Sequence, residues 1–132
     1  RVNGLIQTTS PYPDNAIADT AVFNLGGISG VGLAENDIVD WIWVELRDEN
    51  DYTIIIESKS ALLQRDGDIV NIDGTSNLIF NTFEGNYYVL VNHRNHLGIL
   101  SAAPIVFSGT TTVDFSSNQN VIFGGVNICL II

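Results

Sequence analysis

The sequence has no methionine, one cysteine and one lysine among its 132 residues. A single cysteine excludes an internal disulfide bond. Cys129 stands between Ile128 and Leu130, which favours a buried apolar thiol, with an intermolecular disulfide as the alternative. Because the chain starts at Arg1 without an initiator methionine, we expect it to be processed from a longer precursor.

Basic residues are also scarce. Five Lys and Arg stand against 15 Asp and Glu, for a formal net charge of −10. Binding to nucleic acid or to an anionic membrane surface requires clustered cations, so the composition argues against both partners. A hydrophobic content of 45% with 15% charged residues excludes a disordered acidic tail and fits a single folded domain, residues 1–132.

Long apolar runs are absent except at residues 121–132. This stretch is interrupted by Gly124 and Gly125 and is shorter than the ~20 apolar residues that a membrane-spanning helix needs. The sequence therefore predicts no membrane insertion. It predicts an apolar C-terminal strand instead, which either completes the chain's own sheet or is donated to a neighbouring copy.

The sequence has the alternation of side chains between two faces that is typical of β-strands. Alternation between Ile38 and Leu46 places Ile38, Ile42, Val44 and Leu46 on one face and Trp41 and Trp43 on the other. Asp-Gly pairs mark turns, and Pro104 within residues 99–107 predicts an edge strand or a bulge.

Short strands recur at intervals of roughly ten residues, about eight or nine in all, without a helical period. The pattern predicts an all-β fold, an antiparallel β-sandwich of the Ig-like or Cna-B-like kind. We expect an N-terminal strand and glycine-rich connection in residues 1–36, a core module in 37–115, and the C-terminal strand in 121–132.

Three long motifs carry a resemblance: Asp37 to Asp48 (DIVDWIWVELRD), Ala61 to Asp68 (ALLQRDGD) and Asn86 to Gly98 (NYYVLVNHRNHLG). In this order they resemble a β-sandwich module of large secreted proteins of Bacteroidota and other environmental bacteria. The layout is similar, more loosely, to Cna-B or transthyretin-like sandwiches. The resemblance implies a stalk, spacer or adhesive unit and implies no catalytic residues.

The most concentrated polar motif is His93-Arg94-Asn95-His96. Histidines three apart on a strand point to opposite faces, so both would bind one metal ion only in a turn. Arg94 and Asp40 are expected to pair and thereby satisfy each other's buried polar groups. We therefore interpret Asp40, His93, Arg94, Asn95 and His96 as a structural polar loop, with ligand recognition as the alternative and no confident metal site.

Two further ligand sites are hypotheses. Asp66, Asp68 and Asp73 lie in acidic turns whose oxygen atoms suit calcium, although their spacing does not match an EF-hand loop. The expected cofactor is accordingly none, with Ca²⁺ as the alternative. Trp41 and Trp43 would offer stacking surfaces to a polysaccharide if they were exposed, although core packing is the commoner fate of such side chains.

No nucleophile elbow, phosphate loop or metalloprotease motif is present, so the sequence predicts no enzymatic activity. We expect an extracellular or cell-surface structural subunit of a bacterial fibre, sheath or layer, which forms homo-oligomers or polymers by β-strand pairing. The alternative is a carbohydrate-binding or adhesion module of a multidomain secreted protein. The expected assembly strand is formed by Val126, Ile128, Leu130, Ile131 and Ile132, with the segment near Val2 to Ile6 as a second candidate donor.

Overall fold

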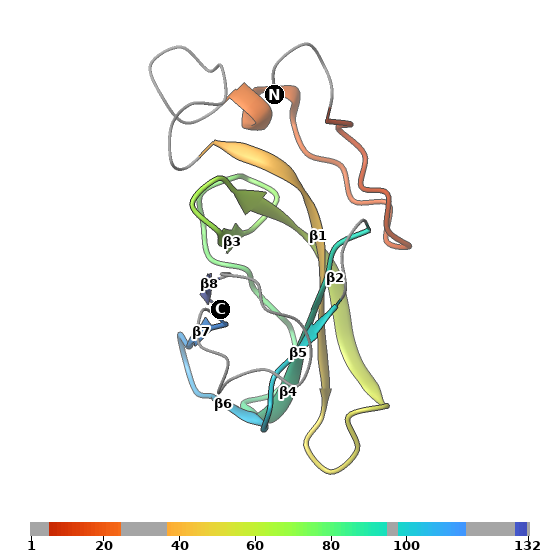
Figure 1. Ribbon diagram of the computed structural model, residues 1–132, viewed down its shortest axis with the longest axis vertical. Helices are drawn as coiled ribbons and strands as arrows, with labels where there is room; N and C mark the ends of the chain where they lie inside the picture. Colours follow the sequence, from red (N-terminus) through yellow and green to blue (C-terminus); the bar gives the residue numbers. More distant parts are fainter. Residues whose placement is uncertain (1–5, 25–36, 95–97, 116–128, 132) are drawn as a thin grey trace.

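The computed structural model describes residues 6–24, 37–94, 98–115 and 129–131 (Figure 1). These residues form strands and one short 3-10 helix, η1 (Thr20–Asn24). The prediction of an all-β fold is confirmed. The strands are β1 (Ile38–Asp48), β2 (Ile55–Gln64), β3 (Asp68–Val70), β4 (Gly85–Asn92), β5 (Ile99–Leu100), β6 (Ile105–Phe107), β7 (Thr112–Asp114) and β8 (Cys129–Ile131).

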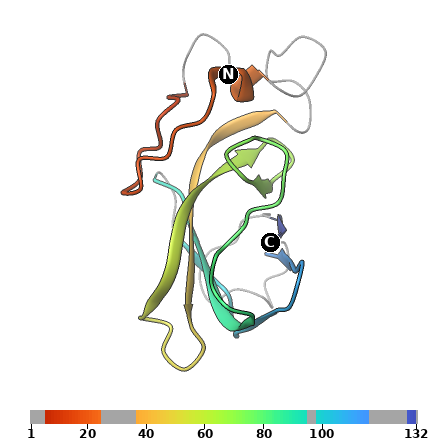
Figure 2. The same cartoon turned by 180° about the vertical axis from the view of Figure 1, so that it is seen from behind.

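The described strands are hydrogen-bonded into one open sheet, in the order β5-β4-β1-β2-β3-β8-β7, with β6 beside β4. Every neighbouring pair is antiparallel except β3 and β8. The sheet curls, so that β6 and β7 come round towards the inner face of the long strands β1 and β2 (Figures 1 and 2). The arrangement of two separate sheets remains a prediction.

Strands β5 and β6 form one interrupted edge, because both pair with the same side of β4. At the interruption, Ser101 donates its backbone N–H to the carbonyl of Val89 at 2.9 Å and accepts the Val89 N–H on its hydroxyl oxygen at 3.0 Å. Residues Ala102 to Pro104 lie outside the named strands. The prediction that Pro104 marks an edge or bulge is confirmed, since proline cannot donate to a ladder.

The inner face of the sheet carries the main hydrophobic core. Ile42, Val44 and Leu46 of β1 alternate towards it, as the sequence pattern predicts. They pack with buried side chains from the opposite wall and from the connecting segments, namely Ala61, Ile69, Leu78, Val89, Val91, Ile99, Phe107, Val113 and Phe115.

The outer face carries a second core, beneath the N-terminal segment. Trp41, Leu62 and Val70 pack there against Ala18, Val22 and Phe23. Ile38 belongs to this cluster, so its predicted place on the face of Ile42 is wrong. The cause is a register shift between Ile38 and Asp40, because one extra residue in a strand moves the side chains before it to the opposite face.

Candidate functional site

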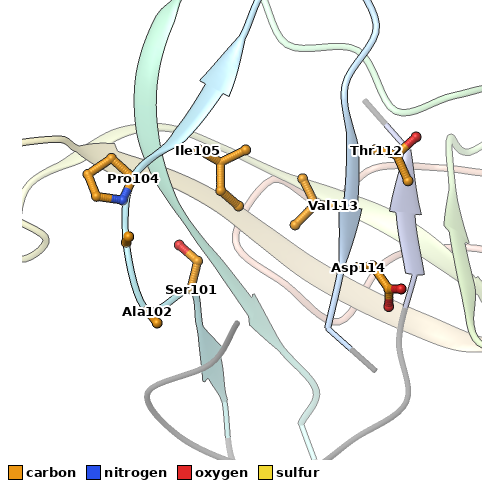
Figure 3. A pocket seen from close by; sticks show the side chains of 8 residues that line it. Ser101, Ala102, Pro104, Ile105, Thr112, Val113 and Asp114 are labelled. Carbon is orange, nitrogen blue, oxygen red and sulfur yellow. The ribbon is translucent and has the colours of Figure 1, made fainter. Parts of the chain in front are cut away.

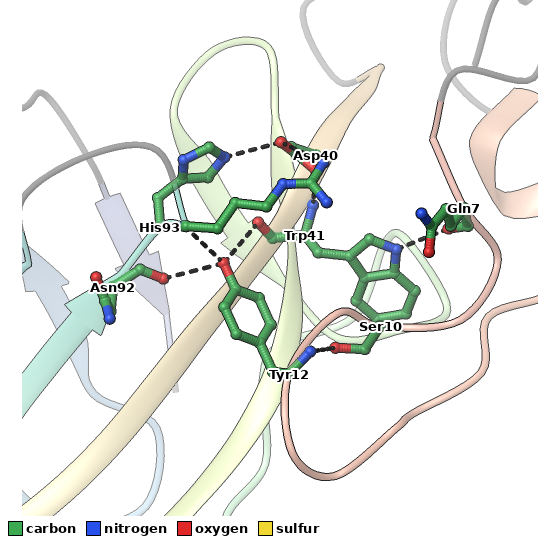
Figure 4. Close-up of polar contacts among 8 residues, drawn as sticks. Gln7, Ser10, Tyr12, Asp40, Trp41, Asn92 and His93 are labelled. Atoms are coloured by element: carbon green, nitrogen blue, oxygen red, sulfur yellow. Dashed lines mark hydrogen bonds and ion pairs between the residues drawn. The ribbon is translucent and has the colours of Figure 1, made fainter.

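Asp40, His93 and Arg94 come together at the end of β4 that lies beside the N-terminal half of β1 (Figure 4). Arg94 donates to Asp40 Oδ1 at 3.0 Å, and His93 Nε2 lies 2.8 Å from Asp40 Oδ2. The pair between Arg94 and Asp40 is the contact that the sequence predicts. Asn95 and His96, the other two residues of the predicted polar loop, lie outside the described residues.

Tyr12 connects this polar cluster to the N-terminal segment. Its hydroxyl accepts the backbone N–H of Arg94 at 3.2 Å and lies 3.4 Å from the carbonyl oxygens of Trp41 and Asn92. Burial raises the pKa of Tyr12, against a smaller opposite effect of the Arg94 N–H. A neutral phenol bonded to three backbone groups anchors one segment to another, so we interpret the cluster as structural.

The three aspartates of the calcium hypothesis lie in or beside turns, where Asp66 and Asp73 accept hydrogen bonds from nearby backbone N–H groups. Asp66 accepts the N–H of Asp68 at 3.0 Å, and Asp73 accepts the N–H groups of Thr75 and Ser76 at 3.0 and 2.9 Å. The Ser76 hydroxyl lowers the pKa of Asp73, whereas burial raises that of Asp68. Among the residues that the structure describes, no three His, Cys, Asp or Glu side chains gather into a metal site, and Asp66, Asp68 and Asp73 are not brought together.

The two tryptophans have different environments. Trp41 is 1% exposed, and its indole N–H donates to the Gln7 carbonyl at 2.8 Å (Figure 4), so the hypothesis of Trp41 as a stacking surface is wrong. The N-terminal segment that buries it has no periodic pattern from which a cover could be predicted. Trp43 is half-buried beside Tyr12, with ring centroids 5.6 Å apart.

Trp43 also belongs to a polar triad that the sequence analysis missed. Glu45, only 7% exposed, accepts the indole N–H of Trp43 at 2.9 Å and Nε of Arg47 at 2.8 Å. Arg47 donates in addition to the Tyr52 carbonyl at 3.0 Å. The spacing in the sequence indicates this grouping, because Trp43, Glu45 and Arg47 are each two residues apart and therefore share one face of β1.

A cavity of about 360 Å³ separates the two ends of the curled sheet (Figure 3). Residues 101–105 line one side of it and β7 lines the other, with Ile105 and Val113 reaching into the space between them. The Thr111 hydroxyl donates to the Val106 carbonyl at 3.1 Å, within the turn that joins β6 to β7. The wall is mostly small and aliphatic and brings no acid–base pair together.

Part of the predicted assembly strand lies in β8. Leu130 and Ile131 belong to this strand, which pairs in parallel with β3 and antiparallel with β7 of the same chain. The sequence left open whether this strand completes the chain's own sheet or is donated to a neighbouring copy. For Cys129–Ile131, the structure shows pairing within the chain's own sheet. Val126, Ile128 and Ile132 lie outside the described residues.

A different part of the sheet is unpaired. Strand β2 pairs with β1 over its whole length but with β3 only at Leu62 and Leu63, so its first half has no second strand partner among the described residues. Ile55 and Ile56 lie there and Ile54 directly precedes the strand, and the three are 49%, 44% and 49% exposed, respectively. We call these three residues the apolar edge.

The borders of the apolar edge are closed by side chains. The N–H of Ser60 donates to Asp14 at 2.8 Å, which ends the open stretch on the upper side. Glu57 accepts the backbone N–H of Asn81 at 2.9 Å, and Lys59 donates to the Ile79 carbonyl. The contacts of Glu57 and Lys59 use side chains of β2, so within the described part of the chain they leave its backbone edge beside the isoleucines available for pairing.

Comparison of the chain with protein-family models, with curated proteins and with solved structures gives no match. The resemblance to a module of secreted bacterial proteins therefore remains a prediction. In the described part of the chain, no helix has the length and hydropathy required to cross a bilayer.

Proposed function

We propose that this protein is a non-enzymatic structural subunit that assembles with copies of itself by β-strand pairing. The apolar edge is the observation that carries the proposal. Exposed β-branched residues on an unpaired strand are what natural sheets normally avoid, because such a strand is a template for another chain. A cell-surface or extracellular fibre, sheath or layer of a bacterium is the setting that we propose.

The arrangement of open edges supports growth beyond a dimer. Besides the first half of β2, the order of the described strands leaves β7 at one end of the sheet and β5 with β6 at the other. A contact between two different edges is head-to-tail, and such contacts form filaments when the rotation does not close. Backbone hydrogen bonds would supply affinity, and the isoleucine side chains would supply specificity.

The energetics favour a lasting contact. Full burial of an isoleucine side chain is worth ~1.5–3 kcal/mol. The side chains of the apolar edge are already about half covered, so their complete burial would add roughly 2–5 kcal/mol in total. This gain adds to the new backbone hydrogen bonds, each worth about 1 kcal/mol net.

Sedimentation velocity over a wide range of protein concentration, combined with negative-stain microscopy, tests the proposal. We expect the wild-type protein to form large particles or filaments and Ile56→Lys to remain monomeric, because a lysine would have to be buried in the contact. Ile17→Lys is the matched control, since Ile17 is 69% exposed in the N-terminal segment. A wild-type protein that stays monomeric at high concentration, or equal loss of assembly in both variants, overturns the proposal.

A further inference from the structure

Two pairs of aromatic rings lie on the lower half of the outer face of the sheet, and we call the surface between them the trough. Trp43 and Tyr12 form the upper wall, with ring centroids 5.6 Å apart. Tyr52 and Tyr88 form the lower wall, with centroids 5.9 Å apart in an edge-to-face arrangement. The described N-terminal segment lies beside the upper part of β1 and β2 and leaves the lower part uncovered (Figures 1 and 2).

Strand register defines the floor of this trough. Glu45 of β1 lies opposite Leu90 of β4 and Ser58 of β2, and Arg47 lies opposite Tyr88. All of these side chains therefore point to the outer face. Trp43 and Arg47 are four residues apart, so the walls stand about 13 Å from each other along the strand. This length suits a short stretch of an extended oligomer.

The chemistry of the trough combines apolar rings with hydroxyl groups that are available for binding. Tyr52 is 48% exposed, and Tyr88, Leu90 and Ser58 are partly exposed. The hydroxyl groups of Tyr52, Tyr88 and Ser58 make no hydrogen bond within the part of the chain that the structure describes. Each can donate or accept one from a ligand.

The triad beneath the rings holds part of this surface in place before any ligand arrives. Glu45 holds the indole of Trp43 and the guanidinium of Arg47, and Arg47 holds the Tyr52 carbonyl. These contacts connect the upper wall to the lower one. A rigid aromatic surface loses little conformational entropy when a ligand binds.

We propose that this trough binds a neutral polysaccharide chain, whose sugar rings lie on Trp43, Tyr52 and Tyr88 and whose hydroxyl groups bond to the tyrosines and Ser58. Aromatic rings offer apolar faces with a polar tip, as a sugar ring requires. The net charge of −10 disfavours an acidic polysaccharide through electrostatic repulsion. The site lies on a sheet face and not on the apolar edge, so it does not rest on self-assembly.

Affinity gel electrophoresis against soluble β-glucan, xylan and mannan, with the acidic polysaccharide alginate for comparison, tests the proposal. We expect at least one neutral polysaccharide to retard the protein, and Tyr88→Ala to weaken that binding about tenfold or more. Tyr88→Phe keeps the ring and should retain most of the affinity. Phe83→Ala is the control, because Phe83 is 91% exposed and is not part of the trough.

Near-ultraviolet circular dichroism of each variant verifies that it is folded before its binding is measured. Absence of retardation by all three neutral polysaccharides overturns the proposal. It is equally overturned if alginate alone retards the protein, or if Tyr88→Ala and Phe83→Ala lose affinity to the same extent. The assembly proposal is measured separately, by sedimentation of Ile56→Lys, so each proposal can fail without the other.

Discussion

The outer face of the sheet has two halves that differ in what covers them. The upper half is closed by residues 6–24, which bury Trp41 and supply Val22 and Phe23 to the second core. The lower half, from Trp43 to Arg47, has a partly buried ion pair, partly exposed aromatic rings and the apolar edge at its border. The same strand thus contributes stability at one end and an accessible surface at the other.

The difference teaches that alternation alone does not distinguish a core face from a binding face. Trp41 and Trp43 point to the same side of β1, two residues apart, yet only Trp41 is fully buried. The burial of a side chain on this face depends on whether another segment of the chain covers that part of the sheet. The contact of Tyr12 with Arg94 and the contact of Asp14 with Ser60 show where the cover ends.

The largest expected effect is that of Trp41→Ala, in the covered half. Removal of a fully buried indole leaves a cavity between Phe23 and the sheet and should reduce the free energy of unfolding by ~3–5 kcal/mol. Trp43→Ala should cost less than half as much, because its ring is already partly exposed. Urea unfolding monitored by far-ultraviolet circular dichroism measures both, and equal losses would contradict the distinction between the halves.

An intermediate effect is expected for Glu45→Gln, which removes the charge at the centre of the triad. The Arg47 guanidinium then loses its ionic partner while it remains partly buried, at an expected cost of ~1–3 kcal/mol in the free energy of unfolding. Glu57→Gln serves as the control, since Glu57 accepts hydrogen bonds in a more exposed place and should change stability by less than about 0.5 kcal/mol. Urea unfolding again decides, and a Glu45→Gln protein as stable as the control would show that the triad is not structural.

The smallest effect on stability is expected for Ile55→Thr, at the apolar edge. Threonine keeps the β-branched shape, and the isoleucine is 49% exposed, so the monomer should change by less than about 0.5 kcal/mol. Thermal unfolding at low protein concentration measures this quantity. A loss above about 1.5 kcal/mol would mean that the apolar edge belongs to the core of the monomer and is not an interaction surface.

Much of the fold follows from sequence pattern. The inner face of β1 is predictable from the alternation of Ile42, Val44 and Leu46, and the edge at Pro104 follows from its missing N–H. The pairing of Arg94 with Asp40 is also predictable, because Asp40 interrupts an apolar strand face and needs a partner of opposite charge. These features depend on residue types and spacing that are visible in the local sequence.

Other features depend on contacts that no local pattern encodes. The register shift that moves Ile38 to the outer face arises from pairing with β2, and the burial of Trp41 arises from a non-periodic N-terminal segment. The sequence left two roles open for the acidic turns, an ordinary turn or a shared calcium ion, and in the structure Asp66 and Asp73 accept nearby backbone N–H groups. Aspartate in a turn serves both purposes equally well, so only the geometry distinguishes them.

Hydrogen–deuterium exchange of the wild-type protein, at low and at high protein concentration, tests the central claim most directly. Our account predicts that amides of residues 54–59 exchange more slowly as the concentration rises, because a second chain pairs with the first half of β2, while those of residues 6–19 keep a constant rate. Exchange at 54–59 that is independent of concentration, in a protein that remains monomeric, would contradict it.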